Sequence, residues 1–185
     1  MLGLLIIIVI SWLLLHFFEQ KSINAIGIIP DINKTFQFFI GFFIISFIVL
    51  LNIYIETRIL NIHWELKTAS CRTIFNAFIY HLKSALTEDL IFRGAILYLL
   101  IKRIGAGWAI LISALFFGIY HVFSYGMTGE SLIPILYVIL VTGFTGYVWA
   151  YSFYKTKSIM LGLGFHLGIN VINTFFFESQ PYGEL

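Results

Sequence analysis

Long apolar runs separated by short polar patches dominate the chain. Crossing a bilayer as a helix takes roughly 20 mostly apolar residues, and the runs are close to that length. The pattern predicts six membrane-spanning helices, at residues 1–18, 36–55, 82–101, 107–124, 132–153 and 158–177. Glycine, proline and charged residues fall between the runs, as is typical of the connections between helices. We therefore expect an all-α protein, a polytopic bundle of transmembrane helices.

Two of these segments have a second interpretation. The run at 1–18 could be a signal peptide, but no basic segment precedes it and no small-x-small cleavage site follows it. We interpret it as the first span. The stretch 62–101 is too long for one crossing, and its first part carries Lys67, Arg72 and Lys83 among apolar residues. We expect this part to lie as an amphipathic segment at the membrane surface.

Composition supports the membrane interpretation. Of 185 residues, 60% are hydrophobic and only 11% are charged, and the mean hydropathy is +0.96. A soluble domain has about 25% charged residues, so the composition excludes a domain that faces water on every side. We expect one membrane domain over 1–185. The net charge of +2 gives no reason to expect a nucleic-acid partner, and the single Cys71 excludes an internal disulfide.

Basic residues are unevenly divided between the two sides of the membrane. Six lie in the first, third and fifth connections: Lys21, Lys34, Lys102, Arg103, Lys155 and Lys157. Three lie on the opposite side: Arg58, Lys67 and Arg72. Cytoplasmic loops carry an excess of Lys and Arg, so this count favours an orientation with both termini outside.

Polar side chains inside the third to sixth runs are the most informative positions. They are Glu88, Asp89, Arg93, His121, His166 and Asn170. A charged side chain at the centre of a membrane helix costs about 2.5–3.5 kcal/mol on insertion scales. Asp89 and Arg93 are four residues apart with the acid first, which favours an ion pair on one helix face. Glu88 lies about 100° around the helix from Asp89 and is expected to face other helices.

The same polar residues are predicted to share one depth in the membrane. Glu88 lies 14 residues before Lys102, and His121 lies 14 residues after Gly107. At 1.5 Å per residue, both lie roughly 21 Å from the same membrane side. Asn170, which shares a helix face with His166, lies roughly 18 Å from that side. A common depth on three helices favours a single functional site.

Other interpretations remain open from the residues alone. Each His or Asn could be an interhelical hydrogen-bond partner, and the small-residue pairs Ala114/Gly118 and Gly164/Gly168 indicate close helix packing, as does Phe117. One carboxylate and two imidazoles, from Glu88, His121 and His166, would also suit zinc. A transporter would place similar groups inside the membrane, although the sequence has no repeated halves. A non-enzymatic membrane scaffold is the remaining alternative.

Taken together, these residues resemble the CAAX protease and bacteriocin-processing family (CPBP, also called Abi) of intramembrane peptidases. That family is marked by Glu-Glu-x-x-x-Arg, then Phe-x-x-x-His, then His-x-x-x-Asn. This chain has Glu88-Asp-Leu-Ile-Phe-Arg93, Phe117-Gly-Ile-Tyr-His121 and His166-Leu-Gly-Ile-Asn170. The second acid is Asp89 where the family has Glu, which weakens any role that needs the longer side chain.

The resemblance implies a glutamate-type intramembrane endopeptidase with its catalytic core at about 82–177, and it implies no cofactor and no metal. Glu88 would activate water, and His121 would hold and orient that water. His166 and Asn170 would form the oxyanion hole. Asp89 and Arg93 would support the catalytic helix. Gly-x-Ser-x-Gly and His-Glu-x-x-His, the signatures of serine and zinc enzymes, are absent from the sequence.

The implied partners are the lipid bilayer and a membrane-associated peptide or protein substrate. The abundance of Ile, Phe, Lys and Asn is typical of an AT-rich bacterial genome. We therefore expect an integral protein of a bacterial cell membrane that acts on a peptide or a small membrane protein.

Overall fold

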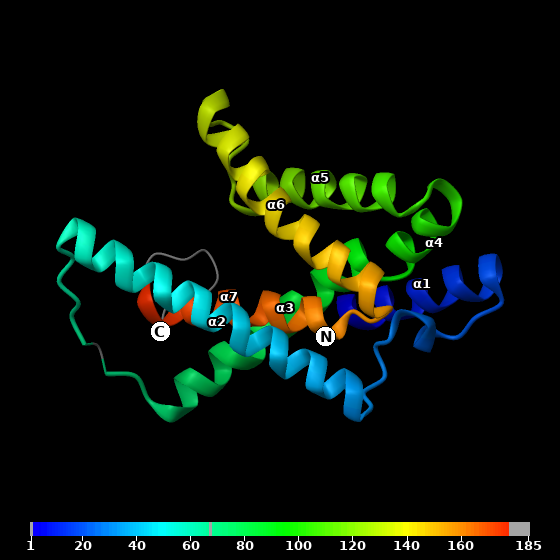
Figure 1. Ribbon diagram of the computed structural model, residues 1–185, viewed down its shortest axis with the longest axis horizontal. Coiled ribbons are helices and arrows are strands. Elements are labelled where there is room, and N and C mark those ends of the chain that lie inside the picture. Colours follow the sequence, from blue (N-terminus) through cyan, green and yellow to red (C-terminus); the bar gives the residue numbers. More distant parts are fainter. Residues whose placement is uncertain (1, 67, 178–185) are drawn as a thin grey trace.

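The computed structural model describes residues 2–66 and 68–177, so residue 1, Lys67 of the expected surface segment and residues 178–185 of the expected domain lie outside it. Within the described residues the chain forms seven α-helices and one short 3-10 helix (Figure 1). These are α1 (Leu2–Glu19), η1 (Ile23–Ile26), α2 (Ile32–Leu60), α3 (Cys71–Arg93), α4 (Ala95–Ile104), α5 (Ala106–Ser124), α6 (Leu132–Thr156) and α7 (Met160–Phe176). The expected all-α helical bundle is confirmed.

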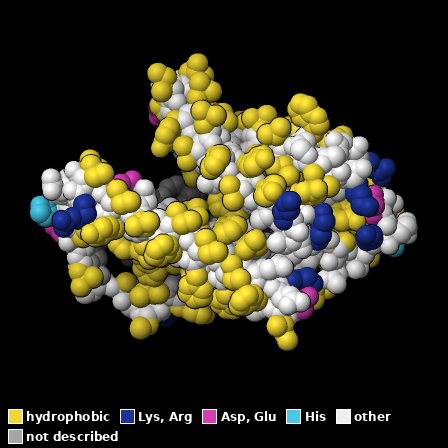
Figure 2. Space-filling model, in the orientation of Figure 1, with side chains coloured by type: hydrophobic (Ala, Val, Ile, Leu, Met, Phe, Trp, Pro, Cys, Tyr) yellow, Lys and Arg dark blue, Asp and Glu magenta, His cyan; other side chains and the backbone are white. Residues whose placement is uncertain are grey.

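Four of the described helices, α1, α2, α5 and α6, are long and apolar enough to cross a membrane. Helix α7 is apolar but has only 17 residues. Helix α3 has 23 residues, but it carries five charged side chains. Large apolar side chains on α2 are exposed, among them Phe36, Phe43 and Phe47. Figure 2 shows hydrophobic side chains over most of the visible face, with Lys and Arg gathered mainly toward one end.

The third predicted span begins earlier in the structure and is divided into two helices, α3 and α4. Helix α3 begins at Cys71, because the Ser70 side chain accepts a hydrogen bond from the Thr73 N–H at 3.1 Å and caps the helix. The expectation of one continuous helix over 82–101 is wrong, because the helix breaks at Gly94. A Cβ at this position would collide with the backbone carbonyl of Leu90. Glycine therefore permits a turn that no other residue could adopt without a shift.

The break at Gly94 leaves a carbonyl that another helix satisfies. The Ser113 hydroxyl of α5 donates to the Phe92 carbonyl at 2.7 Å. A backbone carbonyl in a membrane has no bulk water to bond, so a side-chain donor offsets the loss of the helical partner. This hydrogen bond joins α3 and α5 one residue before Arg93.

Glycines allow two pairs of helices to pack at close range. A Cβ on Gly164 of α7 would meet the carbonyl of Phe38, and one on Gly168 would meet Phe42 and Ile45, all on α2. Gly118 of α5 lies in the same way against Ile139 of α6. Figure 1 shows α2 running across α7 and α6 crossing α5. The predicted packing role of these small residues is confirmed.

Hydrogen bonds at one end of the bundle join the connection before α2 to the connection before α7. The Ile159 N–H donates to the Ile26 carbonyl at 3.0 Å, and the Ser158 hydroxyl donates to the Gly27 carbonyl at 3.1 Å. At the other end, the Trp64 ring contacts the Phe176 ring, with the ring centres 5.3 Å apart. The first and fifth connections therefore lie at the same end of the bundle.

Candidate active site

Three helices bring a carboxylate and two imidazoles together. The Glu88 Oε2 atom on α3 lies 3.7 Å from Nε2 of His166 on α7 and 3.9 Å from Nε2 of His121 on α5. All three side chains are buried. Both distances exceed a direct hydrogen bond but suit a small polar group held between the side chains.

The other carboxylate oxygen of Glu88 has a partner that sequence reasoning missed. The Ser84 hydroxyl, one helical turn earlier, donates to Glu88 Oε1 at 3.0 Å. Glu88 Oε2 accepts no hydrogen bond from any described residue. The i,i+4 spacing of Ser84 and Glu88 was the available signal. Ser84 therefore fixes the carboxylate so that Oε2 faces the histidines.

Backbone geometry sets the tautomer of His121. Its Nδ1 lies 2.8 Å from the Phe117 carbonyl, one turn earlier on α5. Because a carbonyl can only accept, Nδ1 carries the hydrogen. In the neutral ring Nε2 is then an acceptor, and it faces the acceptor Oε2 of Glu88. A molecule that donates two hydrogen bonds would satisfy both atoms.

His166 lies between two carboxylates. Its Nδ1 is 3.4 Å from Asp89 Oδ1, and its Nε2 faces Glu88. Asp89 in turn accepts a hydrogen bond from Arg93 Nη1 at 2.5 Å, so the predicted ion pair is confirmed. Asp89 and Arg93 are each only 1% exposed. The shorter aspartate therefore still reaches both a cation on its own helix and the imidazole on α7.

Aromatic rings enclose the Arg93 guanidinium. Its carbon lies 3.9 Å from the centre of the Phe117 ring and 5.5 Å from that of Trp149 on α6. The Phe117 ring also packs against the His121 ring, with 4.4 Å between the centres. Cation–π contacts stabilise a desolvated guanidinium. Phe117 is thus a packing residue, as predicted, but its packing positions two members of the site. Trp149 carried no signal in the sequence beyond its size.

Asn170 is the predicted site residue that the structure does not join to the others. It lies one turn after His166 on α7 and is partly exposed. Its side-chain amide has no hydrogen-bond partner in the described part of the chain, while its backbone carbonyl accepts from the Thr174 hydroxyl at 2.7 Å.

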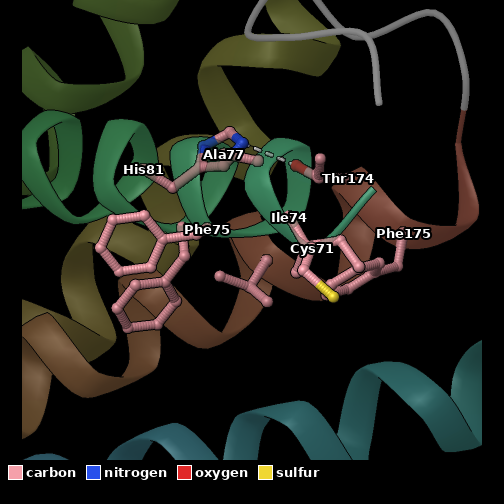
Figure 3. A pocket seen from close by; sticks show the side chains of 9 residues that line it. Cys71, Ile74, Phe75, Ala77, His81, Thr174 and Phe175 are labelled. Carbon is pink, nitrogen blue, oxygen red and sulfur yellow. Dashed lines mark hydrogen bonds between the residues drawn. The ribbon is translucent and has the colours of Figure 1, made fainter. Parts of the chain in front are cut away.

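A second polar contact links α3 and α7 two turns from Glu88. His81 Nε2 lies 2.7 Å from the Thr174 hydroxyl, and His81 is only 3% exposed. Figure 3 shows this pair above an apolar pocket of about 330 Å³, lined in part by Ile74, Phe75 and Phe175. Helix α3 begins well before residue 82, and it buries the His81 ring against α7.

A cavity of about 400 Å³ reaches the buried Glu88. Its walls come from α1, α3 and α5 and include Gly3, Tyr80, Lys83 and Tyr120. An active site that hydrolyses a polymer needs a path for substrate. This cavity is the candidate path, because Glu88 is both a wall residue and the centre of the polar cluster.

A metal centre is the alternative interpretation of the same three side chains. Among the described residues, no group of three or more His, Cys, Asp or Glu side chains is arranged to hold a metal ion. One carboxylate and two imidazoles, from Glu88, His121 and His166, are nevertheless donor types that zinc accepts.

Residues 70–172 match the model of the type II CAAX prenyl endopeptidase Rce1-like family. The matched segment covers more than half of the chain and includes every residue of the candidate site. The chain belongs to this family. The predicted resemblance to CAAX proteases is confirmed, and membership makes the chain a peptidase that acts in a membrane on membrane-associated substrates. No curated protein and no solved structure matches the chain significantly. The Rce1-like segment excludes α1 and α2, although both pack against it.

Proposed function

We propose that this Rce1-like peptidase is an intramembrane endopeptidase in which Glu88 activates the attacking water. The observation that carries the proposal is the convergence of Glu88 Oε2 with Nε2 of His121 and of His166 at 3.9 and 3.7 Å. A water between Glu88 and His121 would donate one hydrogen bond to each acceptor.

The chemical steps follow from this arrangement. The water oxygen attacks the carbonyl carbon of the scissile peptide bond while Glu88 takes one water proton. The resulting tetrahedral intermediate carries an oxyanion. Glu88 then passes the proton to the peptide nitrogen, the C–N bond breaks, and an acid and an amine leave. Glu88 returns to its starting charge, so no further reactant is required.

Oxyanion stabilisation is assigned to His166 and Asn170. The His166 Nε2 lies 3.7 Å from Glu88 Oε2, so this nitrogen is the one positioned toward the reacting group. The Asn170 amide, which has no side-chain partner among the described residues, supplies a second N–H donor.

Asp89 and Arg93 are positioning residues in this mechanism. Arg93 pairs with Asp89, and Asp89 holds the imidazole of His166. We propose a peptide or small membrane protein as the substrate and a bacterial cell membrane as the location. Comparing membrane proteomes of cells with wild-type protein and with Glu88→Gln would identify the substrate.

The decisive variant is Glu88→Gln, which keeps size and polarity but removes the base. We expect cleavage of that substrate by the purified protein to fall by about 10²–10⁴-fold, with normal folding and insertion. Glu130→Gln is the matched control, because Glu130 lies exposed in the connection after α5. Retention of more than about a tenth of the wild-type rate in Glu88→Gln contradicts the assignment.

A further inference from the structure

Two polar contacts join α3 to α7, and they lie two helical turns apart. One is the approach of Glu88 to His166 in the candidate site, and the other is the hydrogen bond between His81 and Thr174 (Figure 3). From the first contact to the second, the chain moves back along α3 and forward along α7, by about 11–12 Å on each helix. The two antiparallel helices are therefore held together at two levels.

Asn170 lies between these two levels. It is one turn after His166 and one turn before Thr174, so all three residues share one face of α7. Its side chain is partly exposed, and its amide makes no hydrogen bond to any described residue. No contact of its own fixes the direction of the amide. The rotation of α7 fixes it instead, and this rotation is set by the contacts on either side.

The direction of each hydrogen bond at Thr174 can be assigned. The Thr174 hydroxyl donates its only hydrogen to the Asn170 carbonyl at 2.7 Å, because a carbonyl can only accept. The hydroxyl oxygen then accepts from His81 Nε2, which lies 2.7 Å away and must carry a hydrogen. The bonds form a chain from the imidazole on α3 through Thr174 to the backbone of Asn170.

Packing alone does not account for the buried His81 ring. A helical threonine often bonds the carbonyl four residues earlier, as Thr142 bonds Val138 at 2.7 Å, so that bond by itself is a local feature. At Thr174 an imidazole from another helix is added. The His81 Nδ1 atom is buried without a hydrogen-bond partner among the described residues, which is a cost to the fold. A leucine would fill the space without this cost, so the contribution of the ring is its bond to Thr174.

We propose that His81 is a positioning residue for the peptidase reaction. Through Thr174 it fixes the rotation of α7, so that the Asn170 amide faces the peptide carbonyl held at Glu88. This inference rests on the proposed function, because it needs Asn170 to be an oxyanion donor. A displacement of about 1 Å at a catalytic group can cost about 10²-fold in rate. Loss of the bond should lower kcat and leave KM unchanged, since the oxyanion forms only during the reaction.

The test measures kcat and KM of the purified protein on a fluorescence-quenched peptide taken from the substrate that Glu88→Gln identifies. Thr174→Val keeps the shape of the side chain and removes the hydroxyl, so we expect kcat to fall by about 10- to 100-fold with KM unchanged. His81→Leu should give the same loss. Thr174→Ser and His81→Gln, which restore a hydroxyl and an N–H donor, should recover most of the rate. Thr142→Val is the matched control, because it removes the same kind of hydroxyl bond from α6 and should keep normal kcat.

A double variant separates positioning from a general loss of stability. If His81 acts through Asn170, His81→Leu/Asn170→Ala should have the kcat of Asn170→Ala within about twofold. A further loss as large as that of His81→Leu alone overturns the inference, because the two residues would then act independently. Wild-type kcat in both Thr174→Val and His81→Leu overturns it as well. Failure of the proposed function looks different: Asn170→Ala or Glu88→Gln would itself keep normal kcat, and the inference would fall with it.

Discussion

The guanidinium carbon of Arg93 lies 3.9 Å from the centre of the Phe117 ring. This contact joins α3 to α5. The same arginine also pairs with Asp89 on its own helix. The two site histidines also pack against the Phe117 ring, with centres at 4.4 and 5.9 Å. One aromatic side chain therefore links the ion pair to both imidazoles.

The ion pair should be a strong stability determinant. Arg93→Met leaves the Asp89 charge buried without a cation and should lower the free energy of unfolding by about 3–5 kcal/mol. The double variant Asp89→Leu/Arg93→Met removes both charges and should recover most of that loss. Denaturation in detergent micelles measures both variants. A double variant no more stable than Arg93→Met would show that the buried charge is not the cause.

The variant Asn170→Ala distinguishes a catalytic role of the amide from a structural one. If its amide stabilises the oxyanion, Asn170→Ala should lower kcat by roughly 10²–10³-fold with little change in KM. Asn173→Ala, three residues further along α7, is the matched control and should keep normal turnover. A helix-bridging role would be worth about 0.6 kcal/mol. Lower thermal stability with normal kcat in Asn170→Ala would contradict the assignment of Asn170 to the oxyanion hole.

A substitution at Gly3 tests whether the substrate reaches Glu88 through the cavity. A Cβ added at Gly3 meets no atom within 4 Å, although the residue lines the cavity that reaches Glu88. Gly3→Phe should therefore leave stability intact and narrow the cavity, lowering kcat/KM by about tenfold or more. Gly107→Phe is the control, because Gly107 is equally unobstructed but lies at the start of α5, outside that cavity. Unchanged kcat/KM in Gly3→Phe means that substrate enters elsewhere.

Cleavage should not require a metal ion. Purified protein treated with a strong chelator should keep its rate, because Glu88 and the two histidines act on water directly in the proposed mechanism. Loss of activity on chelation with recovery on adding zinc would mean that Glu88, His121 and His166 are ligands. A chelator without affinity for zinc serves as the control for effects on the detergent.

Much of the architecture was predictable because the bilayer imposes simple rules. Apolar runs of about 20 residues must be helices, and they correspond to α1, α2, α5, α6 and α7. Polar residues inside such runs are costly, so Glu88, His121 and His166 could be singled out from their positions alone. The structure brings these three side chains together from three neighbouring helices.

The parts that escaped prediction depend on tertiary contacts. In the sequence Gly94 is one more residue within an apolar run. The break between α3 and α4 at this glycine could be recognised only from the close approach of the Leu90 carbonyl in the structure. His81 lies outside the predicted span, and its burial depends on Thr174, 93 positions later. Ser84 and Trp149 are ordinary helix residues until Glu88 and Arg93 are placed beside them. Local pattern cannot supply such pairings.

The glycine contacts between α2 and α7 mean that the segment matched to the family packs against a helix outside that segment. The family segment starts at residue 70, yet the helix carrying His166 rests its Gly164 and Gly168 on Phe38, Phe42 and Ile45 of α2. A fragment from 70 onward would present that bare glycine stripe to lipid. Among orthologues, a larger residue at Gly168 should therefore coincide with a smaller one at Ile45, so that the two helices covary in side-chain size.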